Sequence, residues 1–171
     1  MAMFEVVKKS QSKSFIMTAS NSQLCKLLIG LGKDADISPI CIVRDIKQSE
    51  HLKQLGASEV LDSTDENFLQ NLKDIIKNLK PRIMLDALAN QLSADIFMVM
   101  PNRTRWIVYG KLDITPPVIS EMGQLVFSEK VIDGFWLVKW FRDTELAEQM
   151  QVIKDVQERF VTRKWKTEVS E

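Results

Sequence analysis

Short apolar runs alternate with helical patterns between residues 14 and 110 of the chain. These runs are apolar at successive positions, which is typical of strands that helices cover on both faces. We expect six strands, at residues 14–18, 39–43, 59–61, 83–86, 106–109 and 130–132. Strands that alternate with helices indicate βαβ units joined by right-handed crossovers. The pattern therefore predicts a doubly wound α/β domain, with a six-stranded parallel sheet in the order 3-2-1-4-5-6 and helices on both faces.

Helical periodicity fills the segments between these strands and follows the last one. Three segments carry apolar residues at helical spacing: Leu24, Leu27, Leu28 and Leu31; Phe68, Leu72, Ile75, Ile76 and Leu79; and Leu146, Met150, Ile153, Val156 and Phe160. The middle helix is predicted to begin at Ser63, which has capping-box spacing to Glu66, and to end before Pro81. Residues after Arg163 are polar and add little to a core. We expect one domain at residues 1–160 and a polar tail at residues 161–171.

Composition narrows the classes of function. The 171 residues include 23 basic and 23 acidic side chains, so the protein is not expected to carry the positive electrostatic potential that attracts nucleic acid. Cys25 and Cys41 lie in apolar runs, and with a single histidine they are too few for an ordinary zinc site. The longest apolar runs, such as residues 96–100, are far shorter than the roughly 20 residues of a membrane span. We expect a soluble cytoplasmic protein with no metal and no membrane partner.

The first strand-to-helix turn is where chemistry is expected. In an open parallel sheet, ligands sit beyond the carboxyl ends of the strands, and a helix N-terminus can hold phosphate there. Residues 18–25 read TASNSQLC and contain no glycine. Dinucleotide-binding turns use glycine for a tight turn and for close approach of the pyrophosphate. The residues alone leave open a phosphate-binding turn and a plain N-cap cluster.

Several segments, in order along the chain, resemble one enzyme family. Residues 15–26, FIMTASNSQLCK, resemble the A-x-N-S-G-V-G-[QR] stretch of the quinone oxidoreductase and 2-enoyl thioester reductase branch of the medium-chain dehydrogenase/reductases. The likeness continues in VRD at residues 43–45, LGASEV at 55–60, LDA at 85–87, VYG at 108–110 and GFWL at 134–137. The resemblance implies a Rossmann cofactor domain from an NADPH-dependent oxidoreductase that reduces a conjugated carbonyl, either an enoyl thioester or a quinone.

The resemblance also implies which residues contact the cofactor. They are Ala19, Ser20, Asn21, Ser22, Gln23, Leu24, Arg44, Tyr109, Gly110, Phe135, Trp136 and Leu137. Arg44 ends the second strand, where a guanidinium suits the 2′-phosphate of NADP, or else it is a solvated residue at a strand end. Asp45 is expected to cap the following helix. NAD is the alternative cofactor, and an isolated domain that binds neither is also consistent with the turn.

The sequence departs from the family pattern in two loops. Gln23 and Cys25 replace glycines of the first turn, where their side chains are expected to obstruct the pyrophosphate. Ala89 and Asn90 replace glycines after the fourth strand. Cys25 is expected to face the sheet as a small apolar residue, with activation of its thiol by the helix N-terminus as the alternative.

The family's catalytic domain, with its proton-donating tyrosine and most of the substrate pocket, has no counterpart in this sequence. Residues 3–9 resemble the end of the helix that enters the cofactor domain, and the polar tail would rejoin the catalytic domain. We therefore expect no catalytic residue here and no turnover by this chain alone. Expected partners are the cofactor, the absent catalytic domain of the same polypeptide, and a second copy that pairs along the sixth strand.

Two functions of other classes are alternatives to the cofactor domain. A degenerate reductase-like domain, kept as a non-catalytic binding or regulatory module, is the main alternative. A receiver-type domain is disfavoured, because the turn after the first strand lacks the paired acidic residues that such a site needs.

Overall fold

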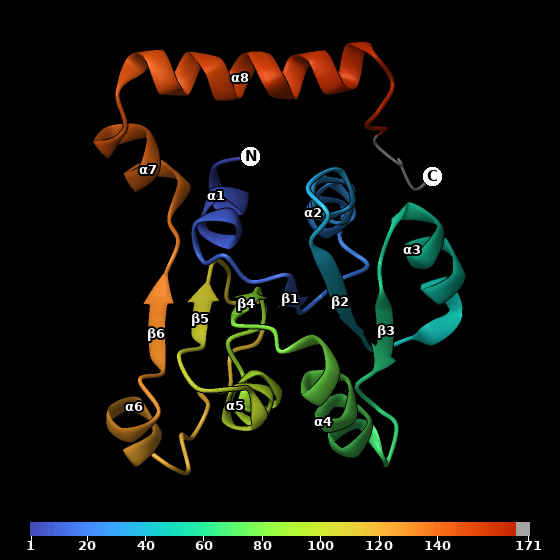
Figure 1. Cartoon of the computed structure of the whole chain (residues 1–171), viewed down its shortest axis with the longest axis vertical. Helices are drawn as coiled ribbons and strands as arrows, with labels where there is room; N and C mark the ends of the chain where they lie inside the picture. Colours follow the sequence, from blue (N-terminus) through green and yellow to red (C-terminus); the bar gives the residue numbers. More distant parts are fainter. Residues whose placement is uncertain (167–171) are drawn as a thin grey trace.

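In the computed structural model, which describes residues 1–166, six parallel strands form a sheet in the order β3-β2-β1-β4-β5-β6 (Figure 1). The strands are β1 Ser14–Met17, β2 Ser38–Val43, β3 Glu59–Asp62, β4 Ile83–Asp86, β5 Arg105–Val108 and β6 Val131–Gly134. The predicted fold class and strand order are confirmed. Strand bounds agree within two residues of those expected, and the largest difference is that β6 continues to Gly134.

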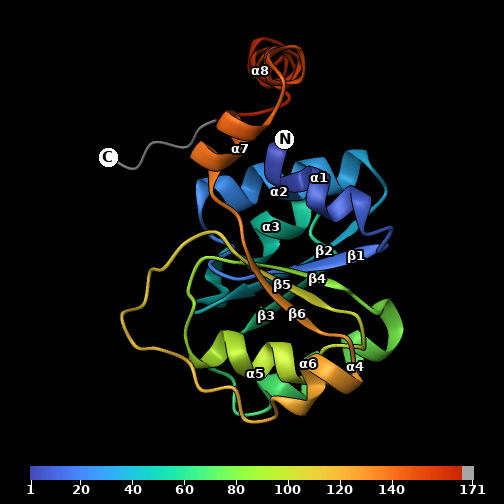
Figure 2. The same cartoon turned by 90° about the vertical axis from the view of Figure 1, so that its left-hand side faces the viewer.

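Helices cover both faces of the sheet, as Figure 2 shows with the sheet nearly edge-on. The α-helices are α1 Ala2–Lys9, α2 Gln23–Asp34, α3 Ser49–Leu55, α4 Phe68–Leu79, α5 Gln91–Val99, α6 Gly123–Phe127, α7 Leu137–Asp143 and α8 Leu146–Val161, and a short 3-10 helix, η1, spans Ile46–Gln48. Helices α1, α2 and α3 contribute to the core on one face, and α4 and α5 to the core on the other.

Successive residues of each central strand point to opposite cores. In β1, Phe15 and Met17 join the core of α1 and α2, while Ile16 joins the core of α4 and α5. In β4, Leu85 joins the core of α1 and α2, while Met84 joins the core of α4 and α5. Because both faces of the central strands are buried, these strands are apolar at most successive positions, which explains the pattern that predicted them.

Close contact between α2 and the sheet depends on Gly32, near the C-terminal end of the helix. A Cβ atom at Gly32 would lie 2.8 Å from the carbonyl oxygen of Ile37 and 2.9 Å from Cγ of Pro39. Neither distance is compatible with a side chain unless the backbone moves. The glycine needed for helix-to-strand packing is thus at position 32 and not in the turn that precedes the helix.

Two expectations about local structure were wrong. Helix α4 begins at Phe68 and not at Ser63, because Asp62 accepts hydrogen bonds from the amide and hydroxyl of Thr64, and Asp65 accepts one from the amide of Asn67. These local bonds favour turns over helix. In the tail, Trp165 is buried, with 7% of its surface exposed, and belongs to the core of α1 and α2.

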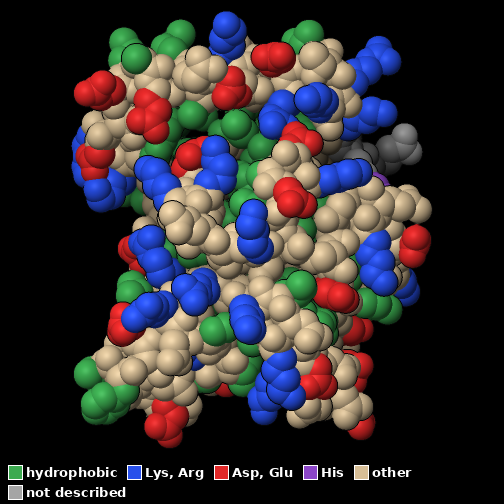
Figure 3. All heavy atoms as spheres, viewed as in Figure 1, with side chains coloured by type: hydrophobic (Ala, Val, Ile, Leu, Met, Phe, Trp, Pro, Cys, Tyr) green, Lys and Arg blue, Asp and Glu red, His purple; other side chains and the backbone are tan. Residues whose placement is uncertain are grey.

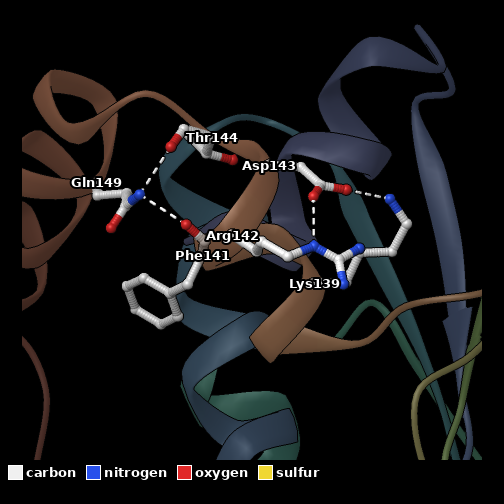
Figure 4. A network of polar contacts seen from close by, with 6 residues as sticks. All are labelled: Lys139, Phe141, Arg142, Asp143, Thr144 and Gln149. Carbon is white, nitrogen blue, oxygen red and sulfur yellow. Dashed lines mark hydrogen bonds and ion pairs between the residues drawn. The ribbon is translucent and has the colours of Figure 1, made fainter.

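A cluster of polar contacts fixes the corner between α7 and α8 (Figure 4). The side-chain amide of Gln149 donates to the carbonyl oxygens of Phe141 and Thr144, each at 2.7 Å. Asp143 accepts from Arg142 at 2.8 Å and pairs with Lys139. These contacts satisfy carbonyl groups at the end of α7 and hold the corner from which α8 crosses above α1 and α2.

The predicted apolar face of α8 is only partly covered. Val156 packs against the core, whereas Leu146 and Met150 are 71% and 57% exposed. Hydrophobic side chains are visible in the hollow below α8, and charges of both signs are scattered over the same face (Figure 3). Among the described residues, no helix has the length and apolar character needed to cross a membrane.

Candidate cofactor cleft

A cleft of about 420 Å³ opens at the carboxyl ends of β1, β2 and β4. It lies where the strand order reverses between β1 and β4, which is the usual ligand position in a doubly wound sheet. The lining residues come from the turn after β1, the ends of β2 and β3, and the loops after β4 and β5: Ala19, Ser20, Asn21, Ser22, Ile42, Val43, Arg44, Asp45, Ser63, Leu88, Asn90, Leu92, Leu112 and Asp113.

The turn after β1 is held by its own serines. Ser20 is buried, donates its hydroxyl to the carbonyl oxygen of Met17 at 2.8 Å and accepts from the amide of Ile42 at 3.1 Å. Ser22 caps α2, because its hydroxyl oxygen accepts from the amide of Cys25 at 3.3 Å. The turn therefore presents the positive end of the α2 dipole at the cleft without a glycine.

Asn21 supplies an acceptor that the protein does not use. Its Oδ1 atom is buried and has no hydrogen-bond partner within residues 1–166. Asn21 also lines the cleft. A buried acceptor without a partner is uncommon in proteins, and a hydroxyl or amide donor of a ligand would satisfy it.

Gln23 and Cys25 lie outside the cleft lining, so the structure does not bear out the expected obstruction by their side chains. Nε2 of Gln23 donates to the carbonyl oxygen of Lys166 at 2.8 Å. This places Gln23 in a separate hollow of about 500 Å³ between α2, α3 and the C-terminal segment. The larger size of that hollow does not make it the cofactor site, because it lacks the strand ends that converge on the cleft.

The thiol of Cys25 is fully buried, as expected for a small apolar residue facing the sheet. Its Sγ atom lies 3.4 Å from the hydroxyl of Tyr109 and 3.6 Å from the carbonyl oxygen of Thr18. Burial raises the pKa of Cys25 and raises that of Cys41 to about 12. Burial therefore argues against activation of the Cys25 thiol by the helix N-terminus, because the cost of desolvating a thiolate opposes it.

The outer end of the cleft carries charge. Arg44 directly follows β2 and is exposed, which agrees equally with a phosphate contact and with a solvated side chain. Asp45 accepts from the amide of Lys47 at 2.9 Å and caps η1, as expected. Ser63, at the end of β3, also lines this end. No cluster of side chains able to hold a metal is found among the described residues.

The loop after β4 forms the facing wall. Ala89 has φ of 52°, in the left-handed region that favours glycine. Asn90 caps α5 and donates its side-chain amide to Asp113 at 2.9 Å, which lowers the pKa of Asp113. Of the two residues that replace family glycines, Ala89 therefore adopts a strained backbone conformation, and Asn90 connects its loop to the loop after β5.

The structure gathers five of the predicted cofactor residues in the cleft: Ala19, Ser20, Asn21, Ser22 and Arg44. The other seven lie outside its lining: Gln23, Leu24, Tyr109, Gly110, Phe135, Trp136 and Leu137. Phe135 and Trp136 border another hollow beside α1. Their contact with a cofactor stays a prediction.

The predicted cofactor contacts omitted the cleft residues that follow β3, β4 and β5, although Asn90 was already noted as a departure from the family's glycines. The omitted residues are Ser63, Leu88, Asn90, Leu92, Leu112 and Asp113. Their position shortly after a strand was the available signal, because the carboxyl ends of parallel strands meet at one edge of the sheet.

Comparison with known proteins agrees with this geometry, although no protein-family model matches the chain. The mitochondrial enoyl-[acyl-carrier-protein] reductase of Dictyostelium discoideum is 30% identical over 155 residues, which cover 86% of this chain and 43% of that protein. The human enzyme of the same name is 29% identical over 136 residues, covering 76% and 36%. The chain thus spans less than half the length of these curated relatives.

The structural match is stronger. A solved structure from Mesorhizobium loti, assigned as an NADPH:quinone reductase, has 44% identity and a TM-score of 0.93, covering 98% of this chain and 48% of that one. The fold and cleft define a nucleotide-binding domain of the doubly wound class. The chain belongs to the medium-chain dehydrogenase/reductase superfamily and corresponds to its cofactor-binding domain.

Proposed function

We propose that this chain is the NADPH-binding domain of an oxidoreductase that reduces a conjugated carbonyl compound, either an enoyl thioester or a quinone. The observation that carries the proposal is the cleft at the reversal of strand order, with the N-terminus of α2 and the buried Oδ1 of Asn21 in its wall. The names of the similar proteins support both substrate classes.

Several groups that line the cleft suit the parts of a dinucleotide. The N-terminus of α2 suits a pyrophosphate, Oδ1 of Asn21 would accept from a hydroxyl, and Arg44 would pair with a 2′-phosphate. NADPH, when bound, supplies the hydride, and the residues of this chain bind and orient it. Tyr109 is not suited to donate the proton, because it lies against Cys25 and burial raises its pKa. We assign proton donation to a part of the polypeptide outside this sequence.

The non-catalytic alternative gains no support from the cleft. It depended on Gln23 and Cys25 blocking the phosphates, and neither side chain lines the cleft. A second copy of the protein is the proposed partner along β6, because this edge strand exposes all four of its residues. The expected cytoplasmic location stays a prediction; the two curated relatives above are mitochondrial proteins.

Calorimetric titration of the chain with NADPH and with NADH tests the proposal. We expect NADPH to bind, and more tightly than NADH, because only NADPH offers a 2′-phosphate to Arg44. Absence of binding by both cofactors would overturn the proposal. In a longer protein that contains this domain, NADPH oxidation with a crotonyl thioester or with a quinone would distinguish the two substrate classes.

A further inference from the structure

Asp86, the last residue of β4, is completely buried beside the cleft. Its carboxylate accepts five hydrogen bonds, all from neutral donors. Oδ1 accepts from the hydroxyl of Thr18 at 2.5 Å, the amide of Leu88 at 3.0 Å and the hydroxyl of Ser93 at 2.8 Å, while Oδ2 accepts from the amide of Ala89 at 3.0 Å and Nε1 of Trp106 at 2.8 Å. A buried carboxylate is tolerated only when such bonds replace water.

These donors belong to elements that are far apart in sequence. Thr18 follows β1, Leu88 and Ala89 form the loop after β4, and Trp106 belongs to β5. Thr18 is bonded twice, because its hydroxyl oxygen also accepts from the amide of Ala87 at 3.0 Å. A single carboxylate therefore ties the carboxyl ends of β1 and β4 to each other and to a side chain of the neighbouring β5, at the position where the cleft opens.

The loops tied to Asp86 contain two alanines in the left-handed region. Ala19 has φ of 50° and directly follows Thr18, and Ala89 has φ of 52° and donates its own amide to Asp86. Glycine adopts this region freely, whereas alanine is disfavoured there. Ala19 lines the cleft, and so do Leu88 and Asn90 on either side of Ala89. At both alanines this conformation costs free energy that glycine would not lose, so contacts that hold the two loops stabilise it.

We propose that Asp86 is a positioning residue for the cofactor cleft, whose carboxylate holds the turn after β1 and the loop after β4 in the shape that a cleft without glycine requires. The inference rests on the proposed function of this cleft as an NADPH site. Asp86 itself does not line the cleft, so it acts through Thr18, Leu88 and Ala89.

The principal test is Asp86→Asn. Whichever carboxylate oxygen the NH2 group of the asparagine replaces, one backbone N–H loses its acceptor: that of Leu88 at the Oδ1 position or that of Ala89 at the Oδ2 position. We expect affinity for NADPH to fall about tenfold, and hydrogen exchange at the amides of Leu88 and Ala89 to become faster. Adding Ala89→Gly should restore most of the affinity, because glycine keeps the left-handed conformation without the anchor.

Leu72→Ala is the matched control. Leu72 is fully buried in α4 and does not line the cleft, so its truncation lowers global stability without touching the network. Below its melting temperature we expect this variant to bind NADPH as the parent chain does, with normal exchange at Leu88 and Ala89. Ala89→Gly should not rescue its stability. An equal loss of affinity in Leu72→Ala and Asp86→Asn would make the effect one of general stability and would overturn the proposal.

Thr18 provides a second pair of variants if Asp86→Asn does not fold. Thr18→Val has nearly the same shape but lacks the hydroxyl, whereas Thr18→Ser keeps it. We expect Val to weaken NADPH binding and Ser to preserve it; equal binding by both would overturn the proposal. If the parent chain itself binds no NADPH, the proposed function fails. Exchange at Leu88 and Ala89, compared between the Thr18 or Asp86 variants and Leu72→Ala, still decides the positioning role.

Discussion

The side-chain amide of Gln23 donates a hydrogen bond to the carbonyl oxygen of Lys166, 2.8 Å away and 143 positions along the chain. Gln23 is the first residue of α2, and Asp34, the last residue of α2, pairs with Arg159 of α8 at 2.6 Å, so residues 159–166 form a C-terminal segment that contacts both ends of the helix. The residue that replaces a family glycine therefore docks the C-terminal segment beside α2. This explains how a long side chain at position 23 can leave the cleft open.

Truncating Trp165 should release this segment. Trp165 is buried, packs edge-on against Phe160 at 5.7 Å between ring centroids and lies under the guanidinium of Arg159. We expect Trp165→Ala to lower the free energy of unfolding by about 3 kcal/mol, measured by urea denaturation. Trp136→Ala is the control, because Trp136 is 62% exposed and its loss should cost less than about 1 kcal/mol. Equal effects of the two substitutions would contradict the docking described here.

Alanine substitutions at two glycines of α2 should have opposite effects on the stability of the protein. A Cβ at Gly32 would meet the backbone oxygen of Ile37 at 2.8 Å, so Gly32→Ala should destabilise the protein by about 1 to 3 kcal/mol. A Cβ at Gly30 would lie 3.5 Å from Nε1 of Trp165, an ordinary contact, so Gly30→Ala should be neutral or stabilise by up to about 1 kcal/mol through helix propensity. Thermal unfolding of both variants measures the contrast, and a stabilised Gly32→Ala would refute the close packing of α2.

Lys130 should make stability depend on pH in the alkaline range. Its Nζ atom is buried and donates to the carbonyl oxygens of Phe97 at 2.8 Å and Met98 at 3.0 Å, and desolvation lowers its pKa from 10.5 to about 8. Between pH 8 and 10.5 the unfolded chain binds more protons than the folded chain, so stability rises with pH. Below pH 8 both states are protonated and this contribution is constant.

The comparison variant for Lys130 is Lys130→Met, which cannot titrate. The stability of the parent chain relative to this variant should increase by on the order of 1 to 2 kcal/mol between pH 8 and 10. Urea denaturation at several pH values measures the difference. A constant difference across this range would show that Lys130 keeps its ordinary pKa in the folded protein.

Arg44→Ala should separate the two nicotinamide cofactors. Arg44 lines the outer end of the cleft, and only NADPH carries a phosphate for its guanidinium. We expect the affinity for NADPH to fall by about 1.5 to 3 kcal/mol while that for NADH is nearly unchanged. Lys47→Ala is the control, because Lys47 is an exposed basic residue close in sequence that pairs with Asp45. This substitution should change the affinity for neither cofactor. Equal weakening of NADPH and NADH would remove the phosphate contact from the proposal.

The sequence by itself determined the fold class, the strand order and the edge of the sheet at which the cleft lies. Successive apolar positions in β1 and β4 follow from burial on both faces, and α2 is recognised by its 3.6-residue period; both signals are local. Ala19 to Ser22 could be placed at the cleft for the same reason, because any residue directly after a parallel strand lies at that edge. The start of α4 also depends on local interactions. There, hydrogen bonds accepted by the side chains of Asp62 and Asp65 favour turns, so the helix does not begin at the capping-box spacing of Ser63 and Glu66.

Only the tertiary structure decided what surrounds each residue. The carboxylate of Asp86 meets the hydroxyl of Thr18 across 68 positions, and Gln23 meets Lys166 across 143. No periodicity encodes such contacts, because a hydrogen bond depends on distance and direction after the strands have paired and the helices have docked. For this reason the sequence indicated that Gln23 would obstruct the phosphates, whereas the packed chain directs that side chain to the C-terminal segment and leaves the cleft open.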